Sequence, residues 1–283
     1  MNVLITGAGG QLGRELTSVF GERAITAAPA QLDVTDAAAV RAMLHEYTPT
    51  VVINAAAFTD VDGCERAPEQ AHEVNAVGPA NLARACADID ARLVQISTDY
   101  VFGADPPPDE NEQPRGYRPE DPPAPINVYG TSKLAGEQAV ASAAANSLIV
   151  RTAWLAGSGR NFVTTMRARG RERQRLYVVA DQVGTPTTTK DLAAAIVRLV
   201  DQRASGLHHV VNAGHASRFE LAAEVLELSG IDVELHPQSS VQAGSRAPRP
   251  AWSVLEPSVP MRSWRQALAE LIDDLDAAVA ASD

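Results

Sequence analysis

The sequence contains few of the residues that build disulfide or metal frameworks. Cys64 and Cys86 are the only two cysteines in 283 residues. They stand in unrelated contexts, so we expect reduced packing residues rather than a disulfide. None of the six histidines stands at a metal-ligand spacing with cysteines or carboxylates. We therefore expect no metal site, and zinc chemistry in particular is disfavoured.

Long apolar runs and a positive net charge are missing as well. No unbroken apolar stretch approaches about 18 residues and no basic, apolar leader opens the chain, so we expect a cytoplasmic protein without a membrane span. The formal net charge of −11 argues against a nucleic-acid partner. A small anionic ligand stays possible, because a binding site responds to local charge. A chain of 283 residues can bury a large core.

The chain opens with a strand, a glycine turn and a helix. Residues 3–6 are apolar and β-branched, and residues 14–20 continue with helical periodicity. Between them Gly7 permits a tight turn, Gly10 lets backbone amides approach a pyrophosphate, and Gly13 lets the helix pack closely on the sheet. The helix N-terminus then faces the anion with unpaired amides and its positive dipole end. This pattern predicts a dinucleotide-binding site.

Strands and helices alternate along the first half, which is typical of a parallel doubly wound sheet. The expected strands are 24–27, 51–54, 92–97 and 148–151, and the expected helices are 36–47, 68–87 and 127–145. Residues 104–125 are rich in proline and acid, so we expect an irregular loop. A loop over the carboxyl ends of the strands is where a lid would lie.

Beyond residue 151 the alternation is less regular. Further strands and helices are expected at 177–180, 189–200, 208–212 and 218–228, an irregular stretch at 238–260 and a final helix at 261–281. We therefore predict an α/β fold with a Rossmann-type doubly wound parallel sheet. Residues 1–151 form its dinucleotide-binding domain, and residues 152–283 complete the sheet and form a smaller C-terminal substrate-binding lobe.

Three side chains in the first half suggest carbonyl chemistry. Tyr129 and Lys133 stand four residues apart, so a helix places them on one face. The ammonium is expected to lower the pKa of Tyr129 from about 10 toward neutrality. Thr98 follows a strand, at the carboxyl edge of the sheet. Taken singly these residues are more often surface pairs or backbone caps, but together they predict the acid group of a carbonyl reductase.

Several motifs resemble the extended short-chain dehydrogenase/reductase family. They are the three glycines, the Asn54-Ala55-Ala56-Ala57 stretch, Asn75, and the pair Tyr129-x-x-x-Lys133. Within it, further stretches resemble the dTDP-4-dehydrorhamnose reductase family, namely residues 97–102, 151–154, 161–162, 181–187 and 249–255. The matches run from residue 3 to about residue 268, so the resemblance covers nearly the whole chain.

The resemblance implies reduction of the 4-keto group of dTDP-4-dehydro-L-rhamnose to give dTDP-L-rhamnose, with a nicotinamide as hydride donor. It makes Tyr129 the proton donor, places Lys133 at the nicotinamide ribose, and places Thr98 at the reacting oxygen. Together with Tyr129 and Lys133, it assigns to the cofactor Gly7, Gly10, Gln11, Leu12, Gly13, Asp33, Val34, Ala55, Ala56, Ala57 and Asn75. Together with Thr98, it assigns to the substrate Asp99, Tyr100, Trp154 and Arg249.

The choice between NADPH and NADH and the oligomeric state are each inferred from one or two positions. The end of the second strand, residues 26–29, has no carboxylate to repel a 2′-phosphate, and Arg14 is the nearby cation. We therefore expect NADPH, with NADH possible. Some members of the family pair through magnesium held by glutamates, where this chain has Lys190. We expect a monomer or weak homodimer without metal. The loop at 104–125 is also longer than in many relatives.

The substrate diphosphate requires cations, and Arg249 opens a motif match. The other candidates in the second half are Arg160, Arg167, Arg169, Lys190 and Arg246. Two alternative functions stay open. One is a sibling reductase of another nucleotide-linked 4-keto-deoxyhexose. The other is a non-catalytic regulatory subunit like that of methionine adenosyltransferase, and the intact set of Thr98, Tyr129 and Lys133 favours an enzyme over it.

Overall fold

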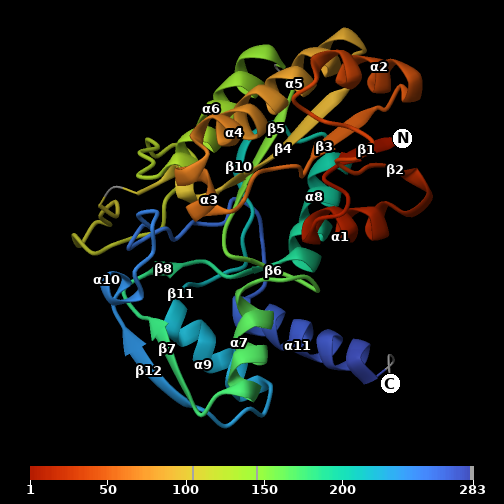
Figure 1. The fold of residues 1–283 in the computed structure, drawn as a ribbon. Coiled ribbons are helices and arrows are strands. Elements are labelled where there is room, and N and C mark those ends of the chain that lie inside the picture. The colour runs from red at the N-terminus through yellow and green to blue at the C-terminus, as the bar shows by residue number, and fades with distance from the viewer. Residues whose placement is uncertain (104, 145, 281–283) are drawn as a thin grey trace.

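A parallel six-stranded sheet organises the structure (Figure 1), which is a computed structural model describing residues 1–103, 105–144 and 146–280. The strand order is β10-β5-β4-β3-β1-β2, and neighbouring strands are parallel. Their bounds are β1 (Val3–Thr6), β2 (Ala24–Ala27), β3 (Val51–Asn54), β4 (Arg92–Thr98), β5 (Leu148–Thr152) and β10 (Gly206–His209). The predicted α/β class with a parallel Rossmann-type sheet is confirmed.

Helices cover both faces of this sheet, which explains why its strands are apolar at successive positions. Val3 and Ile5 of β1 enter the core formed with α1 (Gln11–Phe20) and α8 (Thr189–Asp201). Leu4, between them, enters the opposite core. That core is built with α2 (Ala37–Tyr47), α5 (Gly78–Asp88) and α6 (Val128–Ala143). Cys64 and Cys86 are buried free cysteines, which agrees with the expectation of reduced packing residues.

The helix expected at 68–87 is divided into three parts. They are α4 (Pro68–His72), a π-helical turn (Glu73–Val77) and α5, and a further helix, α3 (Val61–Arg66), precedes them. Pro79 has no N–H to continue a regular ladder, which favours an irregular turn before it. The turn carries the buried side chain of Asn75. The helix expected at 127–145 is α6, which ends at Ala143, and Ala145 lies outside the described residues.

Apart from β10, a strand of the sheet, and α8, which packs on it, most of the second half forms a smaller lobe beneath the sheet in Figure 1. In this lobe α7 (Phe162–Glu172), α9 (Arg218–Leu228) and α11 (Trp264–Ala280) share one apolar core. Short strands pair around it: β6 (Leu155–Ala156) with β9 (Thr187–Thr188), β7 (Arg175–Val179) with β12 (Glu234–Gln238), and β8 (Val183–Gly184) with β11 (Ala216–Ser217). One more short helix is α10 (Ser240–Ala243), and 3₁₀ turns lie at Gly21–Arg23 and Asp99–Val101.

Sequence patterns missed two helices in this lobe. The first is α7, a basic segment with two threonines and a glycine, which is begun by the Asn161 capping box with Thr164. The second is α10, which lies inside the stretch expected to be irregular. The final helix begins at Trp264 rather than at residue 261, and the expected end at Ala281 lies outside the described residues. Within the described ranges, no helix combines the length and apolar character needed to cross a bilayer.

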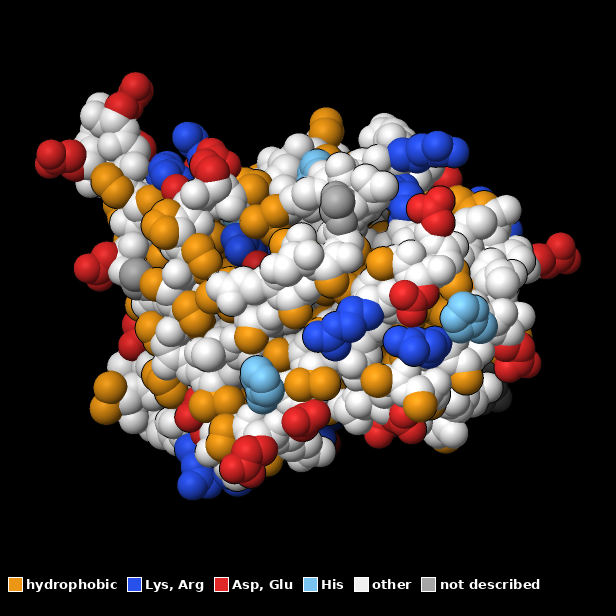
Figure 2. All heavy atoms as spheres, turned by 90° about the horizontal axis from the view of Figure 1, so that it is seen from above, with side chains coloured by type: hydrophobic (Ala, Val, Ile, Leu, Met, Phe, Trp, Pro, Cys, Tyr) orange, Lys and Arg blue, Asp and Glu red, His pale blue; other side chains and the backbone are white. Residues whose placement is uncertain are grey.

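The proline-rich segment is irregular, as predicted, although Ala104 lies outside the described residues. It is attached to the C-terminal half through Tyr117, whose N–H donates to the Val254 carbonyl at 2.7 Å. The Tyr117 ring stacks on Phe102 with 4.0 Å between centroids. A salt bridge of 2.7 Å between Arg115 and Asp121 closes the segment on itself. Figure 2, seen from above the view of Figure 1, shows acidic, basic and apolar side chains interspersed over that face.

Candidate active site

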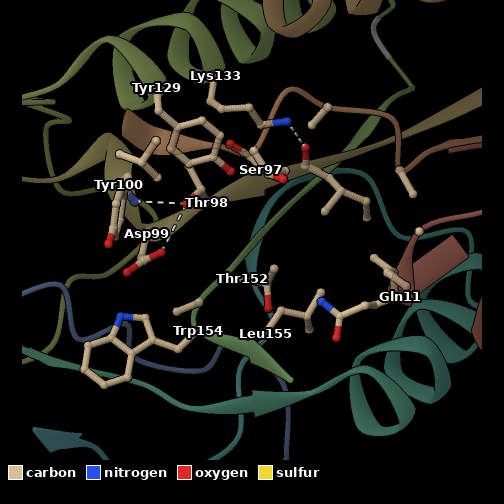
Figure 3. A pocket seen from close by; sticks show the side chains of 18 of the residues that line it. Gln11, Ser97, Thr98, Asp99, Tyr100, Tyr129, Lys133, Thr152, Trp154 and Leu155 are labelled. Atoms are coloured by element: carbon tan, nitrogen blue, oxygen red, sulfur yellow. Dashed lines mark hydrogen bonds between the residues drawn. The ribbon is translucent and has the colours of Figure 1, made fainter. Parts of the chain in front are cut away.

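Two adjoining hollows lie along the carboxyl ends of the strands. The first, about 420 Å³, is drawn in Figure 3 and opens between the glycine turn, the end of β4 and the lobe. Among its lining residues are Gly10, Gln11, Leu12, Gly13, Ala55, Ala56, Ala57, Thr98, Asp99, Tyr100, Tyr129, Lys133 and Trp154. The second, about 630 Å³, includes Gly7, Gly10, Asp33, Val34, Ala55, Ala56 and Ala57 in its lining. The structure thus brings together almost every residue assigned from the sequence.

The glycine turn packs so closely on the neighbouring backbone that Gly7 and Gly13 have no room for a Cβ atom. Gly7 has φ +65, and a Cβ there would lie 2.6 Å from the Ala56 nitrogen. A Cβ on Gly13 would collide with the Gly7 carbonyl. Gly10 donates its N–H to the Gly7 carbonyl at 2.9 Å and caps α1. The open amides at the start of α1 therefore face the hollow, as a pyrophosphate requires. The turn fits a dinucleotide.

Thr98, Tyr129 and Lys133 meet at the end of β4 (Figure 3). The Thr98 hydroxyl donates to Asp99 Oδ1 at 3.1 Å, accepts from the Tyr100 N–H at 3.2 Å, and is hydrogen-bonded to the Tyr129 phenol. Lys133 Nζ donates to the Ile96 carbonyl at 2.7 Å. A phenol, a hydroxyl and an ammonium therefore share one pocket.

The expectation that Lys133 lowers the pKa of Tyr129 toward neutrality is wrong. Burial raises the pKa of Tyr129 above its ordinary value of 10, and the Thr98 hydrogen bond opposes that rise only in part. The Lys133 amine is directed to the Ile96 carbonyl, and burial lowers its own pKa to about 8, with the Glu137 charge opposing. The phenol is therefore protonated at neutral pH, which suits a proton donor.

The residues assigned to the sugar line the same pocket, with Asp99 and Tyr100 beside Thr98 and Tyr129 (Figure 3). Asp99 is buried and accepts a hydrogen bond from Ser253 Oγ at 2.6 Å. Burial raises the pKa of Asp99 to about 6, although the hydrogen bonds from Ser253 and Thr98 lower it. Tyr100 is buried, and its ring meets Tyr129 edge to face with centroids 5.9 Å apart. Trp154 has φ +44, in the left-handed region that tryptophan rarely adopts.

Arg218 lines the same pocket and was missed from the sequence. Its guanidinium is 3.5 Å from the centre of the Trp154 ring and is hydrogen-bonded to Tyr100. Arg218 is the first residue of α9, where a cation opposes the helix dipole. A basic residue at that unfavourable position was the signal available in the sequence.

Two assigned residues are not among the described residues that line these hollows. Arg249 forms a salt bridge with Asp62 at 3.0 Å and contacts the Tyr100 phenol from behind. Asn75 donates to Ser132 Oγ at 3.0 Å and accepts from the Phe58 N–H at 2.9 Å. Arg249 therefore contacts the pocket residue Tyr100, whereas Asn75 contacts Phe58 and Ser132, which are the sequence neighbours of the pocket residues Thr59 and Lys133. Direct contact with a ligand stays a prediction for both Arg249 and Asn75.

Lys190 lies away from the pocket, between α8 and α11. Its ammonium bridges Glu270 at 2.6 Å and Asp274 at 3.0 Å. The positive charge thus stands among carboxylates of its own chain. In the part of the chain that the structure describes, no group of three or more His, Cys, Asp or Glu side chains could hold a metal ion.

The parallel sheet, the glycine turn after β1 and the Tyr129–Lys133 pair beside Thr98 define a Rossmann-type oxidoreductase of the short-chain dehydrogenase/reductase class. The chain belongs to the family described as RmlD substrate binding domain, whose model matches residues 1–277. It is 44% identical over 284 residues to the dTDP-4-dehydrorhamnose reductase of Mycolicibacterium smegmatis, which covers 95% of this chain and 84% of that protein.

Solved structures agree with this membership. A dTDP-4-dehydrorhamnose reductase of Clostridium acetobutylicum superposes with a TM-score of 0.93 at 40% identity, over 98% of this chain and 100% of that chain. The Bacillus anthracis dTDP-4-dehydrorhamnose reductase, solved in complex with NADP, gives 0.92 at 38% identity, over 97% and 100%. The likeness therefore extends over the sheet and the lobe together.

Proposed function

We propose that this protein reduces the 4-keto group of dTDP-4-dehydro-L-rhamnose to dTDP-L-rhamnose with NADPH. The observation that carries the proposal is the meeting of Thr98, Tyr129 and Lys133 in the pocket that the glycine turn borders. Relatives of that name match over nearly the whole chain, which supports the choice of substrate.

The two hollows fit the parts of a dinucleotide. Asp33 and Val34 would border the adenosine, the amides at the start of α1 would hold the pyrophosphate, and Lys133 would bind the nicotinamide ribose. When bound, the reduced nicotinamide supplies the hydride for the carbonyl carbon. NADPH is favoured because residues 26–29, at the end of β2 and just after it, carry no carboxylate, and the Bacillus anthracis relative was solved with NADP. NADH is possible as a second donor.

The protein's own groups act on the carbonyl oxygen. Tyr129 donates its phenolic proton to that oxygen as negative charge develops on it. Thr98 offers a hydroxyl beside the phenol, and both are held in place before the reaction, so little reorganisation is needed. Lys133, protonated below its pKa of about 8, supplies a positive charge to the same site.

Residues 152–283, which also complete the sheet with β10, would form the lobe that binds the nucleotide-sugar. Asp99, Tyr100 and Trp154 would contact the sugar ring, and Arg218 would contact the diphosphate, because it is a cation on the pocket wall. Arg249 would act behind Tyr100. Residues 105–125 would lie over this end as a lid.

We further propose a cytoplasmic protein that is a monomer or weak homodimer, with the dTDP-sugar as its substrate and neither nucleic acid nor membrane as partner. The net charge of −11 and the interspersed charges of the face in Figure 2 support the lack of a nucleic-acid partner. The ion pairs of Lys190 support assembly without a bridging metal.

The test is an assay of the purified protein with synthetic dTDP-4-dehydro-L-rhamnose and NADPH or NADH, in which cofactor oxidation is followed and the product is identified by NMR. We expect oxidation of NADPH and formation of dTDP-L-rhamnose. Rapid turnover of a different 4-keto sugar instead would favour a sibling reductase. Tight NADPH binding without reduction of any keto sugar would favour a regulatory role.

A further inference from the structure

A buried ion pair joins the helix that carries Tyr129 and Lys133 to strand β5. Glu137 of α6 and Arg151 of β5 are 5% and 3% exposed, and Ser97 of β4 beside them is 4% exposed. Burial of opposite charges costs desolvation free energy, so such a pair is a weak explanation of stability alone. None of the three residues was assigned a role from the sequence.

Both carboxylate oxygens of Glu137 accept hydrogen bonds, and Arg151 binds them in a bidentate arrangement. Arg151 donates from Nε to Oε1 at 2.9 Å and from Nη2 to Oε2 at 2.7 Å. The Ser97 hydroxyl donates a short hydrogen bond to the same Oε1. The carboxylate is therefore held between the ends of β4 and β5, and its orientation is fixed.

Two consecutive residues of β4, Ile96 and Ser97, connect this pair to the active site. Lys133 stands one helical turn before Glu137 on α6, and its ammonium donates to the Ile96 carbonyl at 2.7 Å. Ser97, the next residue, donates to Glu137. The strand then reaches Thr98. Helix α6 thus contacts β4 at two consecutive residues immediately before Thr98, which fixes Tyr129 and Thr98 relative to each other.

We propose that Glu137 is a positioning residue of the reductase site, which keeps Lys133 charged and in place although it does not itself contact the reacting groups. The inference rests on the proposed function of Tyr129 and Lys133. Arg151 and Ser97 hold the Glu137 carboxylate where it can act.

The negative charge of Glu137 favours the protonated form of Lys133. Burial lowers the pKa of Lys133 to about 8, and the negative charge of Glu137 is the influence that opposes it. Titratable and charged groups on the elements packed around this site include Tyr129 on α6, Asp62, Cys64, Glu65 and Arg66 on α3, Asp99 after β4 and Arg151 on β5, and Glu137 on α6 is the one whose charge acts on Lys133. Without Glu137, Lys133 would lose its proton at a lower pH, and the unneutralised Arg151 would act in the same direction.

The experiment compares Glu137→Gln with Glu137→Asp, which retains the charge. The dissociation constant of NADPH is measured from pH 6 to pH 10 without substrate, and kcat is measured over the same range with substrate. In Glu137→Gln we expect the alkaline loss of NADPH affinity and of kcat to move about one pH unit lower. Glu137→Asp should keep the wild-type midpoint, even if its kcat is reduced.

A purely structural role of Glu137 predicts a different outcome for the two variants. Both variants would then lose thermal stability and activity, while the alkaline midpoint stayed where it is in the wild type. An unchanged midpoint in folded Glu137→Gln overturns the proposal. Failure of the proposed function is distinguishable, because the wild type itself would then fail to reduce the keto sugar while the pH dependence of NADPH binding still reports on Glu137.

Replacement of Arg151 should shift the alkaline midpoint in the opposite direction from replacement of Glu137, which makes the test stricter. In Arg151→Met, the Glu137 charge is no longer neutralised by its guanidinium partner and acts on Lys133 alone. The alkaline midpoint should then move to higher pH, opposite to Glu137→Gln. A downward shift in Arg151→Met contradicts the assignment. If Arg151→Met does not fold, the comparison of Glu137→Gln with Glu137→Asp still shows whether the charge of Glu137 sets the alkaline midpoint.

Discussion

The guanidinium carbon of Arg218 lies 3.5 Å from the centre of the Trp154 indole, at the wall of the pocket. The backbone at Trp154 has φ +44, so the ring is held at this place by the surrounding fold at the expense of local strain. The side chain also packs closely on Gly184 of β8, where an added Cβ would lie 2.5 Å from the indole nitrogen. Two residues far apart in sequence thus form one rigid cationic surface.

Replacement of Arg218 should therefore weaken substrate binding selectively. In Arg218→Met we expect KM for the dTDP-sugar to rise about 10- to 100-fold, since a hydrogen bond to a charged group contributes about 1.5–3 kcal/mol. The NADPH dissociation constant should not change. Arg218→Lys keeps the charge but loses the planar stacking, so an intermediate KM is expected. Steady-state kinetics with both variants measures this, and an unchanged KM in Arg218→Met contradicts it.

The glycine turn allows a matched pair of substitutions. A Cβ on Gly13 would collide with the Gly7 carbonyl, whereas a Cβ on Gly9 meets nothing within 4 Å. Gly13→Ala should lower the free energy of unfolding by about 1–3 kcal/mol and weaken NADPH binding, because α1 is pushed from the turn. Gly9→Ala should change the free energy of unfolding by less than about 0.5 kcal/mol. Urea denaturation compares the two, and equal effects would argue against the close-packing explanation.

Ionisation of Asp99 should lower the free energy of unfolding as the pH rises, which is unusual for a carboxylate. Its folded-state pKa of about 6 lies above the ordinary 3.8, because burial disfavours the charged form. Ionised Asp99 therefore destabilises the fold above pH 6, and this penalty shrinks as the pH falls from 6 toward 3.8. The penalty amounts to about 3 kcal/mol at pH 8, at 1.36 kcal/mol per pKa unit.

Asp99→Asn removes that penalty but accepts the Ser253 and Thr98 hydrogen bonds less well. We expect a net gain of about 1–2 kcal/mol in the free energy of unfolding at pH 8, which becomes smaller at pH 5. Chemical denaturation of both proteins at pH 8, 6 and 5 measures the difference. A gap between the two proteins that does not vary with pH would show that Asp99 does not titrate as described.

Much of the fold could be predicted because periodicity and turn chemistry act locally. The helix expected at 36–47 is α2, and Asp36 caps it by accepting from the Ala38 and Ala39 amides. The four residues of β1 are fully buried, as their unbroken apolar run suggested. The π-helical turn at Glu73–Val77 could not be predicted, because it depends on where the Asn75 side chain finds its partners, Phe58 and Ser132.

The site residues that local motifs place at the end of a strand or on one helix could be predicted. Residues that reach the pocket through contacts between segments distant in sequence could not. Thr98, Tyr129 and Lys133 follow from one strand and one helix. Arg218 reaches the pocket only because β11 pairs with β8 and brings the start of α9 against Trp154. The pKa of Tyr129 was mispredicted, since sequence spacing gives the neighbouring charge but not the burial that outweighs it.

The most direct test of the account is the rate of a single turnover in Tyr129→Phe, measured with enzyme saturated by NADPH and mixed with the keto sugar. The account predicts a fall of about 10²- to 10⁴-fold, because the proton donor is gone. NADPH affinity and the unfolding midpoint should stay at wild-type values, since the ring remains in place. A wild-type rate in this folded variant would contradict the role of Tyr129 and the carbonyl chemistry assigned to the site.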